Sequence, residues 1–276
     1  MKVFIPKSLQ EAVSFLKENQ NFIPFAGGTD LMPLLAKGVL SKKNSFIDLN
    51  NLTEELSFIN LQEDGNLWIG SLATIRKLCE NHIIAEHFPL IAASAINIGS
   101  VQIRNLATIG GNIANASPAA DLIPALLVHD SSLILTSDKK TRQIDLKDYY
   151  VSYKRTSRKP YELITGIIVK PLEQGRILFR KIGNRKNLSL SKIVVSSYIA
   201  KEFETKDPCR FAAGSVKEIP ARLFNLEESV INRRISESEL RNALLRDISP
   251  INDVRSTCIY RTEVLLRVIR KFIEWK

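Results

Sequence analysis

The chain has 276 residues, of which 45% are hydrophobic and 25% are charged, the composition of a globular protein with room for one large or two modest domains. No apolar run approaches the ~20 residues that span a bilayer, and the apolar stretch at the N-terminus is too short for a secretory signal, so we expect a cytoplasmic protein without a membrane partner. Cys79, Cys209 and Cys258 are odd in number and far apart, which predicts reduced thiols and no C-x-x-C site for zinc or a cluster.

The net charge of +10 raises the question of a nucleic-acid partner. The basic residues, however, are scattered in pairs, without an aromatic-interleaved stripe, so we expect no nucleic-acid binding. A face for an acidic partner subunit, or a charge that only serves solubility, fits this distribution better. The pairs are Lys42-Lys43, Lys139-Lys140, Lys154-Arg155 and Arg233-Arg234.

The N-terminal segment predicts a capped helix and then a strand, a glycine turn and a second helix. Residues 8–11 (SLQE) form a capping box, and the helix that follows ends at Asn21. Residues 22–26 predict a strand that leads into Gly27-Gly28-Thr29-Asp30 and a helix over 31–36. This order presents N–H groups to a diphosphate, and Thr29 or Asp30 could cap the second helix. The spacing matches neither GxGxxG nor GxxxxGK.

A second glycine-rich stretch, residues 96–124, follows a strand at 45–49, a hairpin at 58–69, and helices at 74–81 and 90–96. It contains Gly99, Gly110 and Gly111 and one carboxylate, Asp121. Exposed N–H groups in such a turn form a nest for anions, and the carboxylate can accept hydroxyl hydrogen bonds. The alternative is a tight turn whose glycines only satisfy backbone dihedrals.

The remaining pattern predicts further strands at 133–136, 143–146 and 162–169, and a domain boundary at 171–175. Tyr149, Tyr150 and Tyr153 precede a basic segment, 154–159, for which a solvated loop with one packed tyrosine competes with a cofactor or partner contact. Beyond the boundary, strands at 177–182, 193–203 and 210–216 and helices at 226–234, 237–246 and 258–275 predict an α+β domain.

The motifs FAGGTDLMP and QIRNLATIGGNIANASPAADLIP resemble the FAD-binding subunit of the molybdenum hydroxylases, the flavoprotein of the xanthine dehydrogenase and carbon monoxide dehydrogenase family. The resemblance covers almost the whole chain. It implies an α+β fold, with a two-lobed FAD-binding domain of the PCMH type over residues 1–172 (lobes about 1–52 and 53–172). A C-terminal domain of three antiparallel strands packed on helices then occupies residues 173–276.

The resemblance also implies roles for individual residues. The first loop would wrap the FAD diphosphate and ribityl chain with Ala26, Gly27, Gly28, Thr29, Asp30, Leu31 and Met32. The second stretch would lie along the cofactor with Gly99, Thr108, Gly110, Gly111 and Asn112. Asp121 would accept from the FAD hydroxyls, Ile164 would lie by the adenine or the flavin, and Lys181 would approach the polar edge of the isoalloxazine.

Each of the last three residues has a simpler alternative: a helix cap for Asp121, strand core for Ile164, and a solvent-facing edge position for Lys181. Neither loop contains a histidine, so the FAD is expected to be non-covalent. We expect packing or surface roles for His82, His87 and His129.

No metal, Ser–His–Asp or paired-carboxylate pattern stands out in the sequence, so the chemistry would belong to the cofactor. The resemblance implies a FAD-carrying electron-transfer subunit that passes electrons from iron–sulfur clusters on one partner to NAD or another acceptor. A second partner would be the molybdopterin-binding catalytic subunit. The alternatives are a self-contained flavin-dependent oxidoreductase of the same fold, and a scaffold that keeps the fold without the flavin.

Overall fold

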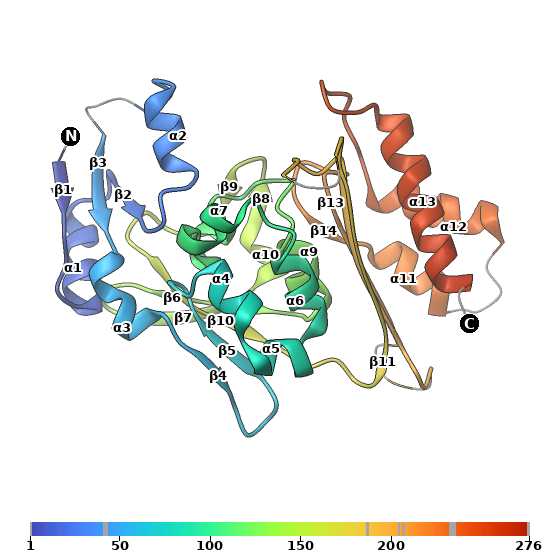
Figure 1. The fold of residues 1–276 in the computed structure, drawn as a ribbon, viewed down its shortest axis with the longest axis horizontal. Helices are drawn as coiled ribbons and strands as arrows, with labels where there is room; N and C mark the ends of the chain where they lie inside the picture. The colour runs from blue at the N-terminus through green and yellow to red at the C-terminus, as the bar shows by residue number, and fades with distance from the viewer. Residues whose placement is uncertain are drawn as a thin grey trace.

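The computed structural model describes residues 2–40, 44–185, 188–203, 205, 208–231 and 236–274. The chain runs from an N-terminal layer through a larger middle part to a C-terminal domain, and the two termini lie at opposite ends of the molecule (Figure 1). Some predicted basic pairs, turns and helix ends lie outside the described residues: Lys42, Lys43, Asn187, Asp207, Arg233, Arg234 and Trp275.

The N-terminal layer is a small parallel sheet in the order β1-β3-β2, covered by one helix. Ser8 caps that helix by accepting from the Glu11 amide, as predicted, but the other half of the predicted capping box is absent because Glu11 Oε2 accepts from the Lys7 amide instead. The helix ends at Glu18, earlier than the predicted Asn21. Its elements are β1 (Lys2–Phe4), α1 (Leu9–Glu18), β2 (Phe22–Phe25), α2 (Leu31–Ala36), β3 (Ser45–Asp48), the 3₁₀ helix η1 (Asn50–Leu52) and α3 (Thr53–Leu56).

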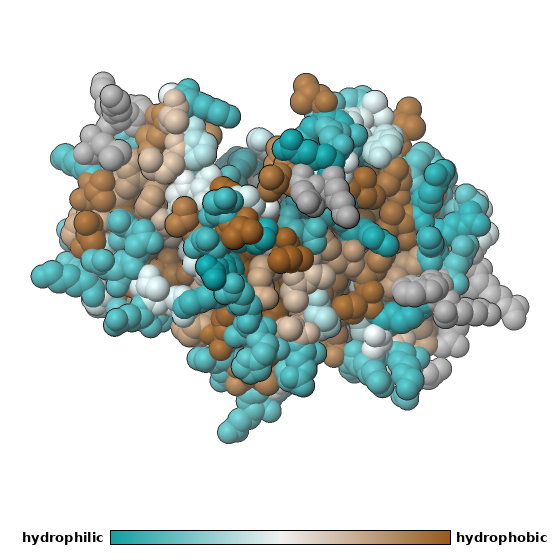
Figure 2. Space-filling view, in the orientation of Figure 1, coloured by the Kyte–Doolittle hydropathy of each residue, from teal (hydrophilic) through white to brown (hydrophobic). Residues whose placement is uncertain are grey.

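Helix α2 has the predicted bounds but not the predicted cap. Asp30 is its N-cap residue, with helical φ and ψ, and its side chain makes no capping hydrogen bond. A capping side chain needs an extended backbone at this position, so the capping prediction for Thr29 or Asp30 was wrong. None of the residues of α2 is buried, and Figure 2 shows apolar surface over it.

The middle part is built on a five-stranded antiparallel sheet in the order β4-β5-β10-β6-β7. Every residue of the central strand β10 is buried, which explains its continuous apolar sequence. A register shift interrupts its pairing with β6 between Ile164 and Gly166. The strands are β4 (Ile59–Leu61), β5 (Leu67–Gly70), β6 (Ser132–Thr136), β7 (Thr141–Asp145) and β10 (Leu163–Val169), with a separate pair β8 (Tyr150–Ser152) and β9 (Arg155–Thr156).

Short helices cover this sheet (Figure 1). The second glycine-rich stretch is not the predicted loop: Gly110 and Gly111 lie in the first turn of a helix, α8. Tyr149 and Tyr150 are both buried and Tyr153 is exposed, so two tyrosines are packed where one was predicted. The helices are α4 (Ile75–Glu80), α5 (His82–His87), α6 (Pro89–Ala95), α7 (Val101–Leu106), α8 (Ile109–Ala114), α9 (Ile123–Val128) and α10 (Leu146–Tyr149).

The C-terminal domain is an antiparallel sheet between two helical layers. Alternate residues of β12 point to opposite faces: Val195 joins the core under α11–α13, and Tyr198 joins the core of the middle part. The three predicted strands on helices are confirmed, and a two-residue fourth strand extends the sheet. The elements are β11 (Gly175–Ile182), β12 (Ile193–Ala200), β13 (Cys209–Gly214), β14 (Ala221–Arg222), α11 (Phe224–Ile231), α12 (Glu237–Asp247) and α13 (Cys258–Glu274).

Polar contacts join this domain to the middle part. The Ser215 amide donates to the Pro118 carbonyl at 2.8 Å, and Arg222 forms an ion pair with Asp130. Within the domain, the buried guanidinium of Arg261 donates to two main-chain carbonyls and to a carboxylate, so this residue has a structural role. Among the described residues, no helix is both long and apolar enough to cross a membrane.

Candidate cofactor-binding site

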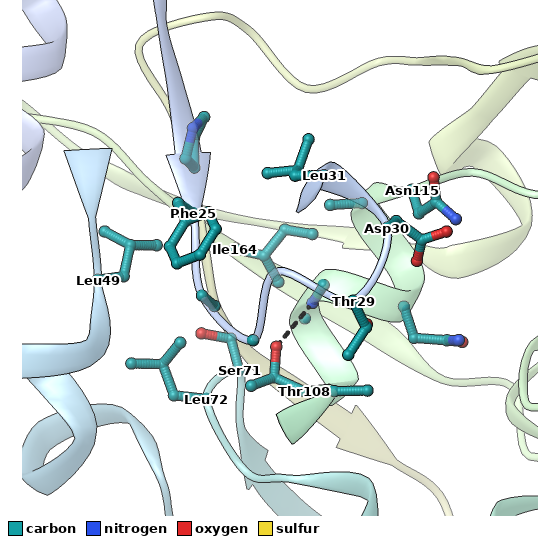
Figure 3. A pocket seen from close by; sticks show the side chains of 18 of the residues that line it. Phe25, Thr29, Asp30, Leu31, Leu49, Ser71, Leu72, Thr108, Asn115 and Ile164 are labelled. Carbon is teal, nitrogen blue, oxygen red and sulfur yellow. Dashed lines mark hydrogen bonds between the residues drawn. The ribbon is translucent and has the colours of Figure 1, made fainter. Parts of the chain in front are cut away.

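A cleft with a volume of about 340 Å³ lies where the N-terminal layer meets the middle part (Figure 3). Its walls are β2 and the loop that follows, the segment of α7 and α8, and the beginning of β10. Most predicted site residues line it: Ala26, Gly27, Gly28, Thr29, Asp30, Leu31, Thr108, Gly110, Gly111, Asn112 and Ile164. Four others do not: Met32, Gly99, Asp121 and Lys181.

The first glycine loop packs directly against the second glycine-rich stretch. A Cβ on Gly27 would lie 1.8 Å from the carbonyl oxygen of Leu106, so only glycine allows this approach. Gly28 has φ +66°, a backbone conformation that disfavours other residues, and a Cβ there would lie 2.7 Å from the Phe25 ring. These two glycines therefore bring together segments that are about 80 residues apart along the chain.

The amides of this loop are open to a ligand. In the described part of the chain, the N–H groups of Gly27, Gly28, Thr29 and Asp30 have no hydrogen-bond acceptor, and the first bonded amide is that of Met32, which donates to the Gly28 carbonyl at 2.9 Å. Consecutive unbonded amides are an anion-binding feature. The loop thus has the donors that a diphosphate requires.

The second glycine stretch does not offer its amides in this way. The Ile109 amide donates to the Ala73 carbonyl and the Gly110 amide to the Ser71 carbonyl, both at 2.9 Å, while the Gly111 amide donates to Thr108 Oγ1 at 3.1 Å. Residues 109–111 therefore form no second amide nest, whereas the amides of residues 99–102, which do not line the cleft, have no hydrogen-bond acceptor among the described residues.

The glycines of α8 serve close packing and cleft space instead. A Cβ on Gly110 would lie 2.7 Å from Ser71, whereas a Cβ on Gly111 would meet only Thr108 Oγ1, at 3.0 Å. Asn112 contributes a polar atom: its buried Oδ1 has no hydrogen-bond partner among the described residues. This orphaned acceptor on the cleft wall fits a ligand that donates a hydrogen bond.

Ile164 lies in the strand core, the simpler of its two alternatives, and also faces the cleft. The residue is only 8% exposed in β10 and also lines the cleft. It is therefore core packing on one side and cleft wall on the other.

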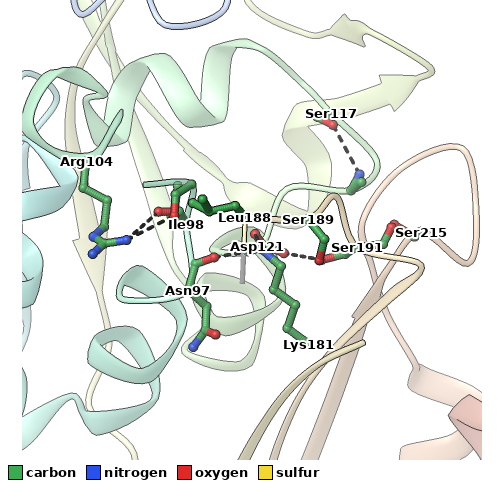
Figure 4. Close-up of polar contacts among 12 residues, drawn as sticks. Asn97, Ile98, Arg104, Ser117, Asp121, Lys181, Leu188, Ser189, Ser191 and Ser215 are labelled. Atoms are coloured by element: carbon green, nitrogen blue, oxygen red, sulfur yellow. Dashed lines mark hydrogen bonds and ion pairs between the residues drawn. The ribbon is translucent and has the colours of Figure 1, made fainter. Parts of the chain in front are cut away.

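Asp121 and Lys181 pair with each other beside the cleft (Figure 4). Lys181 Nζ lies 2.6 Å from Asp121 Oδ2 and 2.7 Å from the Asn97 carbonyl oxygen, and the Ser191 hydroxyl donates to Asp121 Oδ1 at 2.5 Å. The side chains of Lys181 and Asp121 are 10% and 11% exposed. A solvent-facing lysine and a helix-capping aspartate are both contradicted, because the N-cap of α9 is Leu122 and has no side-chain cap.

Burial raises the pKa of Asp121, and the charge and hydrogen bonds of Lys181 and Ser191 oppose that rise. The pair is connected to the cleft through the chain, since Ile98, the residue after Asn97, lines the cleft. Two residues predicted for the site are thus brought together without lining the cleft themselves.

Charged residues that the sequence analysis did not assign also shape the cleft. Glu162 is 3% exposed and accepts from Arg142 Nε at 2.7 Å and Arg142 Nη2 at 2.9 Å. Burial would raise the pKa of Glu162, but the hydrogen bonds from Arg142 and from the Lys159 amide outweigh it and lower the pKa. Arg158 also lines the cleft, and it belongs to the segment 154–159, for which a solvated loop and a cofactor or partner contact were both left open. The sequence feature that could have indicated these cleft residues is a basic segment directly before an apolar strand.

The histidines contribute no chemistry to the cleft. His129 is buried, with Nδ1 2.7 Å from the Lys170 carbonyl oxygen, and burial lowers its pKa to about 4. It is therefore a neutral packing residue, as expected. Across residues 2–40, 44–185, 188–203, 205, 208–231 and 236–274, no group of His, Cys, Asp and Glu could hold a metal ion.

The architecture and the cleft define a class of protein: a domain with an amide-lined cleft followed by a sheet-and-helix domain. Comparison with known families specifies it. Residues 1–171 match the model of the FAD-binding domain in molybdopterin dehydrogenase, and residues 181–276 match the CO dehydrogenase flavoprotein C-terminal domain. The chain belongs to this flavoprotein family and is an oxidoreductase subunit whose cofactor is FAD, as the two glycine motifs had indicated.

Individual similar proteins agree with this family assignment. The chain is 31% identical to the glyceraldehyde dehydrogenase medium chain of Sulfolobus acidocaldarius, over 94% of this chain and 92% of the relative. It is 30% identical to the nicotinate dehydrogenase FAD-subunit of Eubacterium barkeri, over 97% and 93%. A solved carbon monoxide dehydrogenase from Hydrogenophaga pseudoflava shares the fold, with a TM-score of 0.90, 22% identity, and coverage of 98% and 95%.

Proposed function

We propose that this chain is the FAD-carrying electron-transfer subunit of a multisubunit molybdenum hydroxylase. It would accept electrons from iron–sulfur clusters on one partner and pass them to NAD or another acceptor. The observation that carries the proposal is the loop at Gly27–Asp30, whose unbonded amides line a cleft of the FAD-binding family. FAD supplies the electron-transfer chemistry, and the protein supplies binding, orientation and electrostatics.

The first loop would hold the FAD diphosphate. Each hydrogen bond from an amide to a charged phosphate is worth roughly 1.5–3 kcal/mol, so several of them give tight binding without a covalent bond. The other cleft residues, from Thr108 to Asn112 and at Ile164, would pack along the cofactor. Asn112 Oδ1 would accept a hydrogen bond from it.

The pair of Lys181 and Asp121 would act at the polar edge of the isoalloxazine. A fixed cation near that edge favours the added electrons, which is how a protein raises a flavin's reduction potential. Asp121 would keep the ammonium in place. Each of its oxygens has one donor in the structure, and a carboxylate can accept more, so it can still accept from a FAD hydroxyl.

The proposed partners are an iron–sulfur subunit and a molybdopterin-binding catalytic subunit. Support comes from the family resemblance and from the relatives, one described as a medium chain and another as a FAD-subunit. The division of the chain at residues 172 and 173 stays a prediction. We keep the cytoplasm as the proposed location because all three cysteines are free thiols.

The test is purification of the chain with the proteins that accompany it in its own cells. We expect a yellow preparation that releases FAD on denaturation, together with a cysteine-rich small chain and a large chain. FMN in place of FAD, or a colourless protein that ignores added FAD, would contradict the proposal. Reduction of the flavin in the isolated chain by a small substrate would favour the self-contained oxidoreductase.

A further inference from the structure

Arg158 brings a positive charge to the cleft that the glycine loop lacks. The charged residues on the cleft wall are Asp30, Arg158 and Glu162. Amides provide only partial charges, whereas a dinucleotide diphosphate carries net negative charge. A cation at the wall would therefore add what the amides cannot supply.

The structure balances the Arg158 charge only in part: this charge helps to lower the pKa of Glu162, but the two side chains form no ion pair. The nearest acidic side chain on the wall, Glu162, is already paired with Arg142 through two hydrogen bonds and accepts a third from the Lys159 amide. Arg158 forms no ion pair with any carboxylate of the described residues.

The guanidinium is also held in place. Arg158 Nη1 donates to the Glu162 carbonyl oxygen at 2.6 Å and to the Lys159 carbonyl oxygen at 3.1 Å. Main-chain anchors hold one nitrogen of the group, Arg158 also opposes the rise that burial causes in the pKa of the nearby Tyr149 hydroxyl, and among the described residues Nε and Nη2 pair with no carboxylate. A fixed guanidinium with donors to spare suits phosphate oxygens, which it can bind in a bidentate manner.

We propose that Arg158 binds the diphosphate of FAD and sets the preference of the cleft for a dinucleotide over a flavin without phosphates. The inference rests on the proposed function, because it assumes that FAD occupies this cleft. In the proposed complex, the loop at Gly27–Asp30 and the segment before β10 contact the same diphosphate from different parts of the chain.

The experiment measures dissociation constants on the full chain after removal of its flavin, by titration with FAD, riboflavin and adenosine. Arg158→Gln should weaken FAD binding by about 10- to 100-fold, the range for one charge-assisted contact. Riboflavin and adenosine lack the diphosphate and should bind the variant as they bind the wild type. Arg158→Lys keeps the charge without the planar fork and should recover part of the loss.

Arg155→Gln is the matched control, because Arg155 belongs to the same basic segment, is exposed and does not line the cleft. It should leave all three constants unchanged. Equal losses for FAD, riboflavin and adenosine in Arg158→Gln would show a merely structural role and overturn the inference. Unchanged FAD binding would overturn it too, while the proposed function would stand. Wild-type protein that fails to bind FAD would overturn both.

Discussion

Replacing Gly27 by alanine tests the contact that forms the cleft. The added Cβ would lie 1.8 Å from the Leu106 carbonyl oxygen and 2.5 Å from its carbonyl carbon. Both atoms are backbone, so no side chain can rotate away, and the loop must move by more than an ångström. The change therefore displaces the loop amides while it alters no charge and removes no donor.

The magnitude has two parts. Overpacking a close contact costs about 1–3 kcal/mol of unfolding free energy, and a backbone contact should give the upper part of that range. If the shift removes two amide contacts to the diphosphate, at roughly 1.5 kcal/mol each, the loss is about 3 kcal/mol, or about a hundredfold in the FAD dissociation constant.

The assay is a FAD titration of the flavin-free chain, with denaturant unfolding measured in parallel. Gly166→Ala is the control, because a Cβ there would meet its nearest atoms at 3.7 Å, an ordinary contact. We expect the control to retain FAD and Gly27→Ala to lose it. If both variants bind FAD equally well and unfold at the same denaturant concentration, the close approach of the two segments does not form the site.

Three further changes test other parts of the site and the fold. Gly111→Leu places a large side chain in the cleft and should abolish FAD retention while circular dichroism stays native; unchanged flavin content would remove α8 from the site. Lys181→Met should lower the flavin potential, by about 30 mV for each 1.4 kcal/mol of lost stabilisation of the two-electron reduced form, and should destabilise the chain because Asp121 stays buried without its cation; a potentiometric titration equal to wild type would rule out the electrostatic role. Burial raises the pKa of Asp253, but hydrogen bonds from Arg255 outweigh it and lower the pKa to about 2. This depressed pKa should stabilise the fold above about pH 4 by on the order of 2 kcal/mol, and the stabilisation should disappear as the pH falls toward 2. Asp253→Asn should remove that part of the pH dependence of unfolding, and an unaltered profile would contradict the assignment.

Local features were predicted well from the sequence. The cap at Ser8, the bounds of α2 and the β4–β5 hairpin all depend on residues a few positions apart, so short patterns contain the necessary information. The first glycine loop belongs to this group as well. The two adjacent glycines, Gly27 and Gly28, show in the sequence itself that this loop has exposed backbone amides and no side chains to cover them.

The errors have a common physical origin. The second glycine stretch looked like an amide nest, but at Ile109 and Gly110 the N–H groups donate to Ala73 and Ser71, which lie far away in the chain. The solvent-facing alternative for Lys181 fails because the residue pairs with Asp121, 60 positions away in the sequence. Such partners are set by the packing of α8 against the segment after β5 and of β11 against the middle part, and no local pattern reports this packing.

The sequence by itself determined the family, and through it the cofactor, together with the longer helices and strands, because sequence motifs, caps and apolar periodicity act over a few residues. Only the tertiary structure decided which amides stay free for a ligand and which charges are already paired. A hydrogen bond or an ion pair forms between groups a few ångströms apart in space, and residues far apart in the chain reach that distance only when the whole fold is assembled.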